Sequence, residues 1–371
     1  MNAQSQIKGH IMHFKVPALA LGLLTPFCLS SAQAFDLYTD ADTSLSFDGR
    51  VQFRYNTYQD DSHRWDGDSR WALVATQAIN DELDFLAKGE WSVYATEDDY
   101  DDDQHVTQRL LYAGLDHDRY GELTVGKLWG VVYDVGWWTD MGRKFGSRAF
   151  GVYNFDDWGQ VSGAGRADNA VAWRQSFGDW KLGLQYQGRR GDKELAFGVE
   201  ADLTEGIGAS LRRPVGENLE AGVAYIQNTY EDVTPGSGVS DGDKGRLWLA
   251  GIKYATDHIH AAMHVGYSQD WEIAPNGQFY DALGIQAYSY YHFANGLRPN
   301  VNFNWLDDTG EDSEGYRRLT YSFGLEYHFI RDRFLVWSDY QINHGSNGWD
   351  SQERHYGDAD SEWALGIRYD F

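Results

Sequence analysis

The chain has 371 residues, a formal net charge of −25 at neutral pH, a single cysteine, and 15 tryptophans, 24 tyrosines and 18 phenylalanines. The acidic balance argues against nucleic acid as a partner. One cysteine cannot support a disulfide framework.

The first expected element is a targeting segment, residues 1–34. Lys8 and Lys15 precede the apolar run VPALALGLLTPFCLSS, and residues 32–34 read Ala-Gln-Ala. A basic start, a short apolar run and an A-x-A site are typical of a secretory signal peptide, so we expect cleavage near Ala34. Cys28 would leave with it, and the mature chain, residues 35–371, would hold no thiolate metal site or cysteine nucleophile.

Segments with strict alternation of apolar and polar residues follow to the end of the chain. In the last of them, Trp363, Leu365 and Ile367 fall on one side of a strand, and Glu362 and Arg368 fall on the other. Such alternation predicts strands with one apolar and one polar face. Sixteen are expected, at about 44–57, 69–79, 82–95, 106–116, 121–128, 165–176, 179–188, 205–213, 219–229, 244–255, 259–271, 280–293, 298–307, 317–329, 333–344 and 360–371, with 189–213 the least regular stretch.

The connections between these segments alternate in length. Short ones such as AINDE and IRDR carry turn residues, and long ones such as ATEDDYDDDQ and LDDTGEDSEG are acidic. A soluble β-sandwich also has alternating strands, but its strands are usually shorter and its dry core would not hold so many charges. The pattern therefore favours one transmembrane antiparallel β-barrel, with its apolar side toward lipid and its polar side toward a wet lumen.

Several stretches resemble the general diffusion porins of Gram-negative outer membranes. GKLWGVVYDVGWWTD at 126–140 is similar to the entry of that family's third loop, and AGLDHDRYGELTVGK, GRADNAVAWR, NGLRPNVNFNW and LEYHFIRDRFLVWSDYQIN follow the family order. The resemblance implies a sixteen-stranded barrel, a homotrimer, an inward-folded third loop and passive passage of small hydrophilic solutes. It also implies contact with outer-membrane lipid and lipopolysaccharide. The C-terminal Phe371 would be part of the signal read by the barrel assembly machinery.

Strand parity predicts which charges face the lumen, because an arginine facing lipid near the bilayer midplane costs about 2–4 kcal/mol. It places Arg50, Arg70 and Arg109 on the lumen face of their strands, with Phe53, Trp71 and Leu110 respectively on the lipid face of the same strands. Parity also turns Arg166 and Arg174 inward. The residues that match the family's basic wall at the pore constriction are Arg50, Arg70, Arg109 and Arg166.

The third loop departs from the family pattern of aspartate followed by proline-glutamate-phenylalanine-glycine-glycine-aspartate. In TDMGRKFGSRAFG, Asp140 matches the first aspartate, but Lys144 and Arg148 stand where acidic residues are usual, and Arg143 adds a third positive charge. We expect a net basic constriction that favours anions or neutral solutes, opposed by Asp134, Asp140, Asp156 and Asp157.

Aromatic residues crowd the same loop. Trp137, Trp138 and Phe145 have two interpretations: packing of the folded loop against the wall, or a path on which sugars stack. The acidic stretch 97–103 is either a solvated loop or a divalent bridge to lipopolysaccharide phosphates. His258, His260 and His264 do not have the spacing of a metal site.

No motif for catalysis or phosphate binding is present, so neither an enzyme nor a cofactor is expected. Three functions remain: a diffusion channel, a porin selective for a saccharide or an anion, and a barrel hydrolase assembled from separate strands.

Overall fold

The computed structural model describes residues 34–57, 63–67, 69–94, 105–146, 148–155, 158–310, 316–344 and 360–371. These residues form one large antiparallel sheet and a single short helix, α1 (Tyr133–Gly136). Within them, no helix is long and apolar enough to cross a membrane.

The sheet contains 19 strands. Three of them are short: β1 (Phe35–Thr39), β3 (His63–Asp66) and β10 (Arg190–Glu194). The other sixteen are β2 (Thr43–Thr57), β4 (Ser69–Asn80), β5 (Leu83–Val93), β6 (Val106–His117), β7 (Gly121–Trp129), β8 (Arg166–Phe177), β9 (Trp180–Gln187), β11 (Glu200–Pro214), β12 (Leu219–Glu231), β13 (Lys244–Ala255), β14 (Ile259–Ile273), β15 (Phe279–Tyr291), β16 (Leu297–Asp308), β17 (Arg317–Ile330), β18 (Phe334–Asn343) and β19 (Asp360–Asp370).

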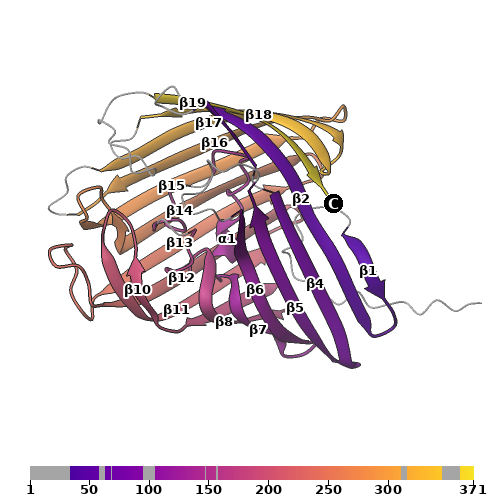
Figure 1. Cartoon of the computed structure of the whole chain (residues 1–371), viewed down its shortest axis with the longest axis horizontal. Helices are drawn as coiled ribbons and strands as arrows, with labels where there is room; N and C mark the ends of the chain where they lie inside the picture. The colour runs from indigo at the N-terminus through magenta and orange to yellow at the C-terminus, as the bar shows by residue number, and fades with distance from the viewer. Residues whose placement is uncertain are drawn as a thin grey trace, which may run out of the picture.

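These long strands close into a barrel (Figure 1). Each pairs antiparallel with the next, from β2 with β4 to β18 with β19. The last strand, β19, then pairs with β2, so that Ile367 lies opposite Phe53. The predicted sixteen-stranded antiparallel barrel is confirmed.

The two faces of the barrel wall differ as the alternation predicts. On β17, Phe323 and Leu325 are exposed on the outer face, whereas Ser322 and Glu326 are buried on the lumen side. Apolar side chains on the outside suit contact with acyl chains, and closure of the ring pairs the backbone groups that hydrocarbon could not solvate.

The two rims are built differently. Turns such as 81–82, 118–120 and 331–333 join strands at one rim, while the connections at the other rim are longer. The segment that joins β7 to β8, residues 130–165, is called loop 3 below. It carries α1, which lies inside the barrel in Figure 1.

One strand starts earlier than the alternation predicts. β11 begins at Glu200 rather than near residue 205, and its added length pairs with β10, with Lys193 opposite Ala201. Val199, Ala201 and Leu203 do alternate with polar residues, but a register shift between Leu203 and Glu205 breaks the period where this part joins the rest of β11.

A β-bulge in β6 makes one prediction from strand parity wrong, the one that Leu110 faces lipid. Glu90 pairs with Leu110 and Trp91 pairs with Gln108, so Arg109 is an extra residue in β6. Both Arg109 and Leu110 are buried, and Leu111 is the exposed residue. Arg109 does lie on the lumen side, but Leu110 does not face lipid, because a bulge interrupts the alternation.

The first strands and the last residue of the barrel meet at its seam. The backbones of Phe371 and Gly49 exchange two hydrogen bonds of 3.0 Å, and the Phe371 ring lies 5.3 Å from that of Phe47 and 5.8 Å from that of Phe35. Phe35 belongs to β1, which pairs with the part of β2 beyond the end of β19. The C-terminal residue therefore completes the closing strand pair; its role in assembly stays a prediction.

Candidate pore constriction

Loop 3 leaves the rim and returns to it through a narrow neck. The backbone N–H of Gly130 donates to the carbonyl of Gly165 over 2.7 Å, and that of Gly165 donates to Gly159 over 3.2 Å. The residues between them are therefore held as an inward fold across the lumen.

Apolar packing fixes the first half of the loop to the wall formed by β12 and β13. Val135 and Trp138 are fully buried and contact a cluster that includes Ile226, Leu247 and Leu249. The His260 ring donates to the Trp138 carbonyl over 2.7 Å, and His264 hydrogen-bonds Thr139 over 2.9 Å. These lumen-facing histidines of β14 thus anchor the loop. Among the described residues, no group of three or more side chains could hold a metal ion.

Asp134 is an anchor rather than an open lumen carboxylate. It is only 2% exposed, accepts hydrogen bonds of 3.1 and 3.2 Å from Arg174 Nε, and accepts another of 2.9 Å from Ser210. Buried between α1 and the wall, its charge is matched by Arg174 and cannot act freely on a passing ion.

Asp140 is held by two phenols of its own loop. The hydroxyls of Tyr133 and Tyr153 each donate to its Oδ2 over 2.6 Å. Burial and the Asp140 charge raise the pKa of both phenols, so that they stay protonated and keep donating.

The loop tip is tied to the wall of β16–β18. The Arg143 guanidinium donates to Glu326 over 2.8 and 3.1 Å, and Glu326 also accepts from Arg298 over 2.7 Å. One residue on, the backbone N–H of Lys144 donates to Asp339 over 3.0 Å. The charge of Arg143 is thereby balanced by a carboxylate that is 0% exposed.

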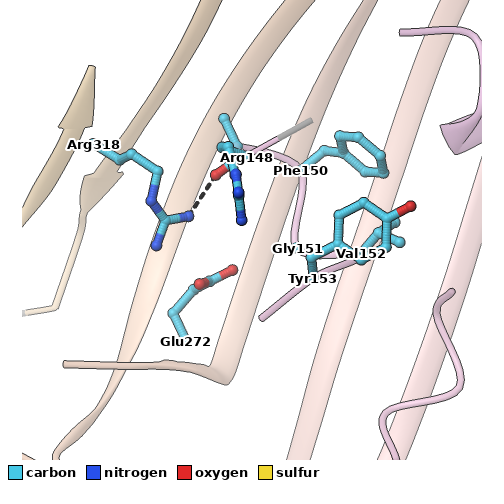
Figure 2. A pocket seen from close by; sticks show the side chains of 8 residues that line it. Arg148, Phe150, Gly151, Val152, Tyr153, Glu272 and Arg318 are labelled. Carbon is cyan, nitrogen blue, oxygen red and sulfur yellow. Dashed lines mark hydrogen bonds between the residues drawn. The ribbon is translucent and has the colours of Figure 1, made fainter. Parts of the chain in front are cut away.

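Arg148 lies at the edge of a small pocket formed where the loop crosses β14 and β17 (Figure 2). Its carbonyl accepts a hydrogen bond from Arg318, and Figure 2 shows the Glu272 carboxylate below the two arginines. Its backbone N–H donates to Asn304 over 2.9 Å. The pocket therefore marks a second tether of the loop.

The opposite wall carries the four arginines that match the family's basic wall. Arg50 and Arg70 are half-buried and lie opposite each other on β2 and β4. Arg109 and Arg166 are buried, and the charges of Arg70 and Arg109 act on Arg166. The structure thus brings Arg70, Arg109 and Arg166 together.

Sequence reasoning missed the carboxylates that sit among these bases. Glu90 lies 2.6 Å from Arg109 and 3.1 Å from Lys88, and the charges of Lys88 and Glu90 act on Asp48. Glu326, Glu272 and Asp339 on the far wall were missed too. Parity alone could have placed Asp48, Glu90, Glu326 and Asp339 in the lumen, since each occupies a polar position of its strand. It could not have placed Glu272, which lies beyond a bulge in β14 and past the end of the predicted strand.

The aromatic residues proposed for solute stacking are buried. Trp138 is fully buried, Trp137 is 7% exposed, and Phe145 packs on Leu335 and Trp337. Their placement matches the packing interpretation. The acidic stretch 97–103, together with Asp156 and Asp157, lies outside the described residues.

Comparison with known proteins identifies the family. The family model described as Gram-negative porin matches residues 18–371. The chain is a Gram-negative porin. The predicted family is confirmed, and with it the outer-membrane location and a channel function.

Individual relatives agree with this. Outer membrane protein S2 of Salmonella typhi is 29% identical to the porin, over 96% of this chain and 100% of its own length. Outer membrane porin N of Escherichia coli (strain K12) is 29% identical, over 76% of this chain and 78% of its own. Among solved structures, Salmonella typhi OmpF in complex with daunomycin superposes with a TM-score of 0.75 at 20% identity, covering 91% of the porin and 100% of OmpF. That structural likeness shows the fold.

Proposed function

We propose that the porin lets small hydrophilic solutes diffuse passively across the outer membrane, and that its constriction favours anions and uncharged solutes over cations. The observation that carries the proposal is the balance of charged side chains at the level of loop 3. In a narrow pore with low-dielectric walls, such fixed charges set the local potential.

Basic residues outnumber acidic ones on the wall that faces the loop. Among the described residues of β2, β4, β5, β6 and β8, the bases at this level are Arg50, Arg70, Lys88, Arg109 and Arg166, and the acids are Asp48 and Glu90. A solute that passes this wall therefore meets a net positive surface.

The loop side adds little negative charge. Asp134 is buried against Arg174, and Asp140 is engaged by two phenols. Arg143 is balanced by Glu326, while Lys144 and Arg148 bring further positive charge to positions where the family is usually acidic.

The net charge of −25 does not oppose this proposal. Much of it belongs to acidic stretches between strands, such as 97–103 and 309–314. Salt of about 0.1 M screens such charges over about 10 Å, so the nearest fixed charges dominate within the constriction.

Reversal potentials in planar bilayers across a salt gradient test the proposal. Wild type should show a potential of the sign expected for anion preference, and Lys144→Glu should shift it toward cations. Arg119→Glu is the control with the same change of charge, because Arg119 is exposed in the turn 118–120 at the opposite rim, and it should leave the potential unchanged. Clear cation preference in wild type would overturn the anion-leaning constriction.

Further properties are inferred from membership of the family. We infer a homotrimer in contact with outer-membrane lipid and lipopolysaccharide, delivered by a cleaved leader and inserted by the barrel assembly machinery, with no catalytic activity. An unheated detergent gel should show a species of about three chains that dissociates to monomer on boiling.

A porin with a solute-binding site is the second candidate function, and an exposed tryptophan in loop 3 favours it.

A further inference from the structure

Trp158 differs from the other tryptophans of loop 3. Its side chain is 53% exposed, whereas Trp137 and Trp138 are buried. Its φ of 61° lies in the left-handed region, which a bulky side chain rarely adopts. Strain of this kind persists only when surrounding contacts impose it, and it is concentrated at functional sites.

Backbone contacts hold Trp158 beside the start of β8. Its carbonyl accepts a hydrogen bond of 3.3 Å from the backbone N–H of Arg166. The Tyr153 ring meets the indole edge-on at 5.8 Å, and the Arg166 guanidinium lies 5.3 Å from the indole centroid. The indole N–H makes no hydrogen bond to any described residue, so an exposed aromatic surface with a spare donor faces the solvent.

Arg166 provides an anchor for negative charge next to this surface. It is 7% exposed, and among the described residues no carboxylate lies within ion-pair distance of it. The positive charges of Arg109 and Arg70 act on it and repel it, although Arg109 is itself paired with Glu90. A buried guanidinium without an anionic partner is costly, and a bound anion would relieve that cost.

We propose that Trp158 and Arg166, with Arg70 and Arg109 close by, form a subsite for ring-bearing anions. The planar or sugar ring of the solute lies on the indole, and its carboxylate or phosphate lies on the arginines. Small inorganic anions lack the ring, and uncharged sugars lack the acid group, so each makes only half of the contacts. This inference rests on the proposed anion preference and names the solute class that the channel holds longest.

Current block in planar bilayers tests the subsite with a matched pair of probes. Acetate and benzoate carry the same charge, but only benzoate has a ring. Benzoate should interrupt the single-channel current of wild type at about tenfold lower concentration than acetate, because one ring contact is worth roughly a factor of ten. Trp158→Ala should remove this difference, and Trp158→Phe should restore part of it.

Trp180→Ala is the matched control. Trp180 is 43% exposed and has an arginine, Arg213, 4.7 Å from its ring centroid, but it starts β9 at the turn rim, on the outer face. It should leave the block by benzoate unchanged. Arg166→Gln should weaken the block by benzoate while leaving that by benzyl alcohol, an uncharged ring, as it was.

The subsite is overturned if acetate and benzoate block wild type equally, or if Trp158→Ala keeps the difference between them. Reversal potentials from the same bilayers report the anion preference independently. Anion preference without a ring effect would therefore contradict the subsite alone, whereas cation preference would contradict the proposed constriction.

Discussion

At the scale of single residues, Glu326 holds the most consequential position. Its carboxylate accepts from Arg143 of loop 3 and from Arg298 of the wall, and it lies 3.1 Å from His328 Nε2. It both fixes the loop tip and neutralises one of the three bases that distinguish this loop from the family pattern.

Glu326→Gln should loosen the loop tip and increase anion preference. Removing one partner of a buried ion pair typically costs about 3–5 kcal/mol, and Arg143 would regain an unbalanced charge. We expect larger fluctuations in single-channel current and a reversal potential shifted further toward anions.

Asp307→Asn serves as the control, since Asp307 pairs with Arg317 on the wall and makes no hydrogen bond to the described residues of loop 3. Equal current noise and selectivity in Glu326→Gln and wild type would show that the tip is held by its backbone contacts alone.

At the scale of elements, the close packing of loop 3 on the barrel wall depends on glycines that face the lumen. A Cβ at Gly284 of β15 would lie 1.6 Å from the Ala149 carbonyl oxygen, and one at Gly222 of β12 would lie 2.9 Å from Trp138 and Val135. The loop backbone thus lies directly on the strand backbone at Gly284.

Gly284→Ala should push the segment around Ala149 away from the wall and into the lumen. Overpacking of this kind costs about 1–3 kcal/mol, and the displaced loop should lower the single-channel conductance. Ala287→Leu adds more volume on the outer face of the same strand and should leave conductance unchanged. An unaltered conductance in Gly284→Ala would mean that the strand yields instead of the loop.

At the scale of the whole molecule, the barrel depends on closure between its first and last long strands. Phe371 contributes two backbone hydrogen bonds to Gly49 and a ring that packs on Phe47. A structural role and a role as an assembly signal predict different results when the ring alone is removed.

Phe371→Ala should reduce the amount of folded porin in the outer membrane of cells more than it reduces spontaneous folding into lipid vesicles. Loss of the ring costs about 3 kcal/mol in either setting, whereas loss of a signal acts only in cells. Phe47→Ala removes the same ring contact from the other side and should affect both settings alike. Equal losses for the two variants in cells would argue against the signal.

The sequence by itself determined the wall of the barrel. Period-2 alternation predicts each of the sixteen long strands, and it places Arg50, Glu90 and Glu326 in the lumen, because lipid and water impose opposite demands on successive side chains. The family resemblance further predicted the inward loop.

Only the tertiary structure decided how charges combine inside that wall. Arg143 pairs with Glu326, which lies 183 residues away in the sequence. The bulge at Arg109 turns Leu110 toward the lumen, and nothing in the local alternation of residues predicts that bulge. Likewise, Trp138 and Trp158 are both aromatic residues of one loop, yet one is buried and the other exposed. Alternation reports which face a strand residue takes, but an irregular loop has no such period, so its contacts follow from the path of the folded chain.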